Sequence, residues 1–254
     1  MSGHSHARTI KHLKEQTDKK RSQMFSKMTR LISVAVRAGG SNPETNSRLR
    51  MTLEQAKYFN MPKENIERAI KRAAGEGKEE QLEEVLFETF GPGGIAVLIE
   101  GITDNRNRTL GEIKQILNQN GGKLAGEGSV KWLFERKGTI IVDWKVQNAD
   151  LQNKEKIELT AIEAGADDIY RHDDVLDVYT KPDELEKVKK NLEEKGIKID
   201  SASLDWVAKE EVELNKKDRE DCQKLFDALD ENDSVQDIYS NIKLPSASEG
   251  VKEI

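Results

Sequence analysis

Apolar residues recur at helical spacing in three successive stretches near the start of the chain. The first stretch begins at Phe25 and stops at Gly39-Gly40. The second follows Asn42-Pro43, which we expect to be a cap with proline in the first helical turn. The third begins at Met61-Pro62 and ends at Gly75. The pattern predicts a small bundle of three amphipathic helices.

The pattern changes after a polar, glycine-containing linker at residues 76–82. Short apolar runs typical of strands lie at 85–90, 95–99 and 129–134, and the glycine-rich turn 91–94 joins the first two. Between the second and third runs, a helix is expected with Leu110, Ile113, Ile116 and Leu117 on its inner side.

A self-contained alternation of strands and helices follows. Its elements are expected at 139–144, 153–164, 168–172, 175–180, 182–195 and 197–203. The order is β-α-β-β-α-β, which is ferredoxin-like. In its first helix Ile157, Ala161 and Ile162 are expected to face inward. A last helix at 216–229 and a strand at 235–239 have too few partners to fold alone, so we expect them to return to the sheet begun at Val85.

The expected fold is therefore α+β with three domains. A basic helical bundle is expected over 1–78, and a discontinuous α/β domain over 79–135 plus 205–242. A ferredoxin-like βαββαβ domain is expected as an insertion over 136–204, so that two α/β sandwich domains follow the three-helix bundle. Residues 243–254 show no periodicity and are expected to form a disordered tail.

The charge of the chain differs between the predicted helical bundle and the remaining domains. The whole protein carries −6, but residues 1–75 carry +10 and the remaining residues −16. A basic segment attracts polyanions, whereas an acidic body repels them and restricts where they dock. The alternative is that Lys and Arg serve here only as helix formers. On the first helix Lys20, Lys27, Arg30 and Arg37 cluster away from the apolar stripe, where we expect them to meet solvent or phosphate.

Lys and Arg bind phosphates and release counterions, which gives affinity for nucleic acids without reading the base sequence. The candidate nucleic-acid-binding residues are Arg8, Lys11, Lys14, Lys19, Lys20, Arg21, Lys27, Arg30, Arg37, Arg48, Arg50, Lys63, Arg68, Lys71 and Arg72. The bundle has few aromatic residues, so it does not resemble a base-stacking platform. No helix-turn-helix spacing or zinc finger predicts readout in a DNA groove.

The segment 103–109 (Thr-Asp-Asn-Arg-Asn-Arg-Thr) lies at a strand-to-helix junction. Its polar residues fit helix capping, and Arg106 and Arg108 beside a helix start fit an additional anion contact. Both interpretations stay open. The glycine-rich stretches at 91–94 and 120–129 lack the features of phosphate-binding loops, so flexible loops are expected, with a contact surface as the alternative.

Other chemistry is not expected. The one cysteine, Cys222, excludes an internal disulfide and is expected to be a plain helix residue. His4 and His6 could chelate a metal together with His12, but no carboxylate or Cys stands at ligand spacing, so a metal site is not expected. His172 is expected to be exposed. We therefore expect no metal, no cofactor, no catalytic residue and no enzyme activity. Without an apolar run long enough to cross a bilayer, or a signal core, the protein is expected to be cytoplasmic and to bind no membrane.

Several long motifs along the chain occur together in one known family. They are the stretches 3–5, 10–12, 25–27, 61–70, 91–94, 103–109, 128–130 and 165–169. In these stretches the chain resembles the YebC/PmpR family, whose mitochondrial relatives are translational activators of cytochrome c oxidase subunit I. The resemblance implies a three-domain, non-enzymatic regulator of gene expression. Here His6-Ala7 replace the family's usual Lys-Trp, so one cation and one aromatic residue are missing from the N-terminal contact region.

Three hypotheses about function follow. The first is a nucleic-acid-binding regulator that resembles the DNA-binding transcriptional regulators of this family. The second is a translation factor that binds ribosomal RNA and the ribosome. The third is a protein adaptor, with the acidic domains as the contact surface. Duplex DNA and ribosomal RNA both fit the basic bundle, and the lack of a groove-reading motif favours RNA or recognition of shape.

Overall fold

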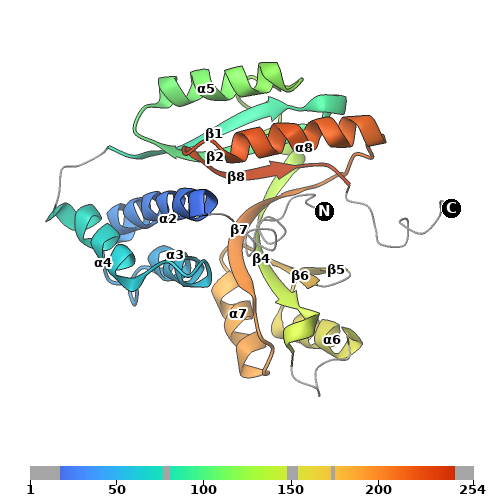
Figure 1. Cartoon of the computed structure of the whole chain (residues 1–254). Helices are drawn as coiled ribbons and strands as arrows, with labels where there is room; N and C mark the ends of the chain where they lie inside the picture. The colour runs from blue at the N-terminus through green and yellow to red at the C-terminus, as the bar shows by residue number, and fades with distance from the viewer. Residues whose placement is uncertain (1–17, 77–80, 148–153, 173–174, 244–254) are drawn as a thin grey trace. The chain divides into compact units, whose positions relative to one another are not determined.

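The structure is a computed structural model that describes residues 18–76, 81–147, 154–172 and 175–243. The described residues form two compact units (Figure 1). The first unit contains residues 18–132 and 214–240, and the second contains residues 133–213 and 241–243. The predictions for Arg8, Lys11 and Lys14, for the side chain of Lys19, and for the tail after residue 243 lie outside this description.

The first unit begins with helices α2 (Asp18–Gly39), α3 (Ser47–Tyr58) and α4 (Lys63–Lys71), and a π-type turn (Arg72–Glu76) follows. Their apolar stripes meet in one buried cluster, because each helix repeats its apolar residues every three or four positions. The cluster contains Met28, Ile32, Ala35, Leu49, Ala56, Met61, Ile66 and Ala69.

Helix α3 begins later than the sequence predicts. The Asn46 side chain caps it by accepting the N–H of Leu49 at 3.0 Å, and its amide donates to the carbonyls of Ala35 and Gly40, both at 2.8 Å. One buried Asn thus satisfies the end of α2 and the start of α3. The Asn42 side chain accepts the N–H of Glu44 at 3.0 Å, so Asn42-Pro43 forms a turn. The expected cap at Asn42-Pro43 is wrong.

A four-stranded antiparallel sheet completes the first unit, with the strand order β3-β1-β2-β8. Its strands are β1 (Glu83–Phe90), β2 (Ala96–Thr103), β3 (Lys123–Leu124) and β8 (Val235–Ser240). Helices α5 (Arg106–Gln119) and α8 (Lys216–Asp230) contact each other over this sheet (Figure 1). Strand β8, from the end of the chain, pairs with β2 from Val97–Ser240 to Gly101–Val235.

The second unit has a sheet of its own, with the strand order β5-β6-β4-β7. In chain order its elements are β4 (Phe134–Asp143), α6 (Lys154–Ala164), β5 (Asp168–Arg171), β6 (Val175–Thr180), α7 (Leu185–Glu194) and β7 (Ser201–Ala208). This β-α-β-β-α-β order with antiparallel pairing is that of a split βαβ motif.

Three details of the predicted α/β parts are wrong. The closing strand expected at 197–203 is β7, which begins only at Ser201 and runs to Ala208. Residues 129–134 do not form a strand, because Lys131–Leu133 is a 3-10 turn and β4 begins at Phe134. Ile162 is 55% exposed, because it lies about 100° around helix α6 from the buried Ala161. The mixed helix-and-sheet class is confirmed. The division into three domains stays a prediction, and the described contacts group the helical bundle with the first sheet.

Candidate nucleic-acid interface

Lys27 is buried, although the helical pattern placed it on an outward face. Only 4% of the residue is exposed. Its ammonium group donates to the Oδ1 of Asp230 at 2.7 Å and to the carbonyl of Asp230 at 2.9 Å. Asp230 is the last residue of α8, so the charge of Lys27 is neutralised within the first unit. The expectation that Lys27 meets solvent or phosphate is therefore corrected.

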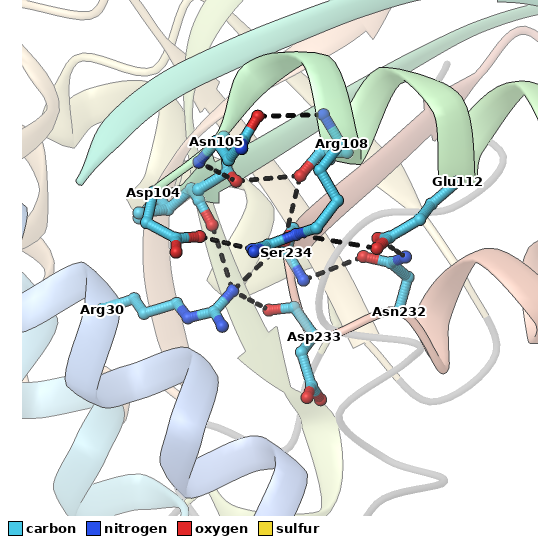
Figure 2. A network of polar contacts seen from close by, with 11 residues as sticks. Arg30, Asp104, Asn105, Arg108, Glu112, Asn232, Asp233 and Ser234 are labelled. Carbon is cyan, nitrogen blue, oxygen red and sulfur yellow. Dashed lines mark hydrogen bonds and ion pairs between the residues drawn. The ribbon is translucent and has the colours of Figure 1, made fainter. Parts of the chain in front are cut away.

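Arg30 is also engaged within the first unit. Its Nη1 donates to the carbonyl of Asp233 at 2.6 Å and to the carbonyl of Ile102 at 3.1 Å, as Figure 2 shows. The Ser234 hydroxyl lies 3.4 Å from the same nitrogen. One turn before Lys27, the side chain of Gln23 donates to the carbonyl of Glu231 at 3.1 Å. Positions 23, 27 and 30 form one stripe of α2, and this stripe docks on the 230–234 turn.

Other cations of the bundle remain at the surface. Arg48 is exposed and its Nη1 donates to the carboxylate of Glu84 at 3.0 Å. Arg50 is half-buried and donates to the carbonyl of Pro43 at 3.2 Å. We call the other predicted contacts of the bundle that are exposed the exposed basic set, which consists of Lys20, Arg21, Arg37, Lys63, Arg68, Lys71 and Arg72.

Helix α4 and the turn after it present the densest part of this set. Arg68, Lys71 and Arg72 stand three and four positions apart, so they are neighbours on one side. Ile66 and Ala69 are buried on the other side, which fixes the orientation of the helix. Lys63, in the first turn, lies 3.7 Å from the carboxylate of Glu67. The apolar pattern of α4 thus holds its cations outward.

The segment 103–109 is a helix cap in this structure. The Asn105 side chain accepts the N–H of Arg108 at 3.0 Å, and the Thr103 hydroxyl accepts the N–H of Asn105 at 2.9 Å. Arg108 binds the Asp104 carboxylate at 2.5 Å and lies 3.7 Å from that of Glu112 (Figure 2). The hydrogen bond from Arg108 lowers the pKa of Asp104. Arg106 is exposed, and its role as an additional anion contact stays a prediction.

The glycine-rich segment after β3 is organised by a buried carboxylate that sequence reasoning missed. Glu88, on β1, accepts the N–H groups of Gly128 and Val130 at 2.6 Å and that of Lys131 at 2.7 Å. Burial alone would raise the pKa of Glu88, but the three backbone N–H donors lower it below its usual value. The only signal in the sequence is an acidic residue inside an apolar strand pattern.

The remaining candidate groups are Cys222, His172 and the side chains that could bind a metal. Burial, followed by the charges of Asp218 and Asp221, raises the pKa of the Cys222 thiol to about 11. His172 is not exposed as expected, because its Nε2 lies 2.9 Å from the buried carboxylate of Asp177. Among the described residues, no group of three or more His, Cys, Asp or Glu side chains could hold a metal ion. In the same residues, no helix combines the length and the apolar character needed to cross a membrane.

Two family models together match nearly all of the described chain. The model of the TACO1/YebC N-terminal domain matches residues 5–76, and that of the TACO1/YebC second and third domain matches residues 82–242. The chain belongs to the TACO1/YebC family.

Relatives in this family are similar over their whole length. A protein of Halothermothrix orenii is 44% identical over 96% of both chains, and one of Aquifex aeolicus is 47% identical over 96% of this chain and 97% of its own. Each is named a probable transcriptional regulatory protein. The crystal structure of a conserved hypothetical protein from Aquifex aeolicus, 44% identical, matches with a TM-score of 0.83 over 94% of this chain and 96% of that chain.

Proposed function

We propose that this TACO1/YebC protein is a non-enzymatic regulator of gene expression that binds nucleic acid through the exposed basic set. The observation that carries the proposal is the outward row of Arg68, Lys71 and Arg72 on α4 and its following turn. Cations at this spacing neutralise neighbouring phosphates and release counterions. The names of the relatives support a role in transcription.

The same proposal excludes two of the candidate residues from direct contact. Lys27 donates to Asp230, and Arg30 donates to the carbonyls of Ile102 and Asp233. Moving either side chain to a phosphate would break these hydrogen bonds, and a hydrogen bond that involves a charged group typically contributes about 1.5–3 kcal/mol. Both residues therefore hold the bundle in place instead of binding the ligand.

Two targets fit this chemistry. Duplex DNA fits a transcriptional regulator, and ribosomal RNA fits a translation factor. Phosphate contacts alone supply affinity for either polymer. Crosslinking in cells followed by sequencing of the bound nucleic acid separates them, because promoter sequences indicate transcription and ribosomal RNA indicates translation.

The phosphate contacts are tested by the salt dependence of binding. We compare the whole protein with a variant carrying Arg68→Ala, Lys71→Ala and Arg72→Ala, on a DNA duplex and on a ribosomal RNA fragment. The slope of log K against log salt is expected to fall by about one for each lost contact, whatever the base sequence.

A matched control removes the same number of exposed cations elsewhere. Lys181→Ala, Lys187→Ala and Lys190→Ala lie in the second unit and are expected to leave the salt slope unchanged. The proposal is wrong if the α4 variant keeps the wild-type slope on both polymers. It is also wrong if the control variant loses as much slope as the α4 variant, because binding would then follow net charge alone.

A further inference from the structure

Trp132 is presented on the surface of the first unit. It is 63% exposed, whereas Trp144 is 7% exposed and Trp206 is half-buried. Large aromatic side chains are ordinarily buried, since each carries much apolar surface. This indole lies outside the helical bundle and exposes most of its surface, and the chain around it restricts what it can bind.

The backbone that carries Trp132 is ordered on both sides. The carboxylate of Glu88 holds the preceding residues through three N–H groups, and Val130 is fully buried. The indole Nε1 itself donates to the carbonyl of Ser129 at 3.1 Å. Directly after Trp132, the 3-10 turn ends and the buried Phe134 begins β4. The indole is thus fixed before any ligand arrives, and binding costs little further ordering.

The chain segment that leads to Trp132 is polar and exposed. Gly128 has a φ of +80°, and nothing lies within 4 Å of the place where a side chain would start. Lys131 and Glu127 are exposed neighbours in the sequence, and Lys123 is exposed on β3. Residues 121–132 carry two Lys and one Glu, so the segment is weakly basic. The segment thus joins one aromatic ring to glycines and cations, whereas the centre of a protein–protein interface is typically apolar and poor in charged residues.

We propose that Trp132 stacks on an unpaired nucleobase, with Lys131 beside the adjoining phosphate. The inference rests on the proposed function and deepens it by naming an unpaired stretch of the nucleic acid as the target of this loop. Bases inside a duplex are covered by their neighbours, whereas bases in loops, bulges and single strands offer a free face to an aromatic side chain.

The test uses the whole protein and two RNA probes, a hairpin with an unpaired loop and a blunt duplex with the same stem sequence. Trp132→Ala is expected to weaken hairpin binding about tenfold, because stacking on one base typically contributes that much. Trp132→Phe is expected to retain most of the affinity, since its ring also stacks. Affinity for the duplex is expected to stay unchanged in both variants. In the wild type the hairpin is expected to quench tryptophan fluorescence, and in Trp132→Ala this quenching is expected to be lost.

The control for folding is the thermal unfolding temperature, which an exposed side chain is expected to leave unchanged. The stacking proposal is overturned if Trp132→Ala binds the hairpin as the wild type does, or if it weakens hairpin and duplex equally. The α4 variant described above distinguishes this failure from failure of the proposed function. A loss of salt slope on both probes in that variant, with no effect of Trp132→Ala, overturns only the stacking.

Discussion

Helices α2 and α4 belong to the same basic bundle and use their cations in different ways. In α2, Lys27 and Arg30 are turned into the protein, where Asp230 and the carbonyls of the 230–234 turn accept their hydrogen bonds. In α4, Arg68 and Lys71 are turned outward. The net charge of a segment therefore overstates the number of cations that a ligand can contact, because some of these cations form hydrogen bonds within the protein. Three pairs of variants test this difference between buried and exposed charges.

Charge reversal at a buried and at an exposed position of α2 is expected to give the largest contrast. Lys27→Glu places a second carboxylate beside Asp230 in a buried position, and this is expected to lower the free energy of unfolding by about 3–5 kcal/mol. Lys20→Glu, on the exposed part of the same helix, is expected to change it by less than about 0.5 kcal/mol. Denaturant titration of both variants measures the difference, and equal midpoints would remove the distinction between the buried and the exposed position.

The second pair of variants compares a buried acidic residue, Glu88, with an exposed one on the same strand. Glu88→Ala leaves the N–H groups of Gly128, Val130 and Lys131 without their acceptor, so a loss of about 2–3 kcal/mol in the free energy of unfolding is expected. Glu83→Ala, at an exposed position of the same strand, is the matched control and is expected to be near neutral.

The pH dependence of the Glu88 effect has a defined sign. Folding lowers the pKa of Glu88, so its contribution is fully present above the usual value of 4.5 and is lost as the pH falls through the lower pKa of the folded protein. The difference in stability between the wild type and Glu88→Ala is therefore expected to be constant near neutral pH and to shrink in acid. A difference that grows as the pH falls from 5 to 3 would contradict this role.

The smallest contrast lies within the 103–109 segment. Arg108→Ala removes the contacts to Asp104 and Glu112 and is expected to lower the free energy of unfolding by about 0.5 kcal/mol, as for exposed ion pairs. Arg106→Ala is expected to leave stability unchanged and to reduce the salt slope of nucleic-acid binding by about one. Thermal unfolding and binding titrations measure the two effects, and the interpretation fails if the two variants exchange their effects.

The order of helices and strands could be predicted because it depends on local periodicity. The same argument explains where prediction failed. Asn42 and Asn46 both have the chemistry of a helix cap, and only Asn46 reaches the carbonyls of Ala35 and Gly40. The start of β4 could not be placed, because Glu88 binds the backbone of residues that otherwise resemble a strand. Such side-chain-to-backbone contacts leave no periodic signal.

The candidate site could likewise be predicted from the sequence only in part. The outward row on α4 could be predicted, because Ile66 and Ala69 determine which side of the helix is buried. The inward turn of Lys27 could not, because its acceptor lies 203 residues further along the chain. The anchored position of Trp132 could not be predicted either, since a glycine-rich stretch ordinarily indicates a loop without fixed contacts.

The contact between Lys27 and Asp230 also sets an order of events during protein synthesis. At about 5–20 residues per second, α2 leaves the ribosome roughly 10–40 s before its acceptor is made. Strand β8, which covers the edge of β2, is made later still. A chain that stops before Asp230 lacks both the acceptor for Lys27 and the strand beside β2, and an open strand edge promotes association with other chains. The segment that contains Asp230 thus decides whether α2 has a place to dock.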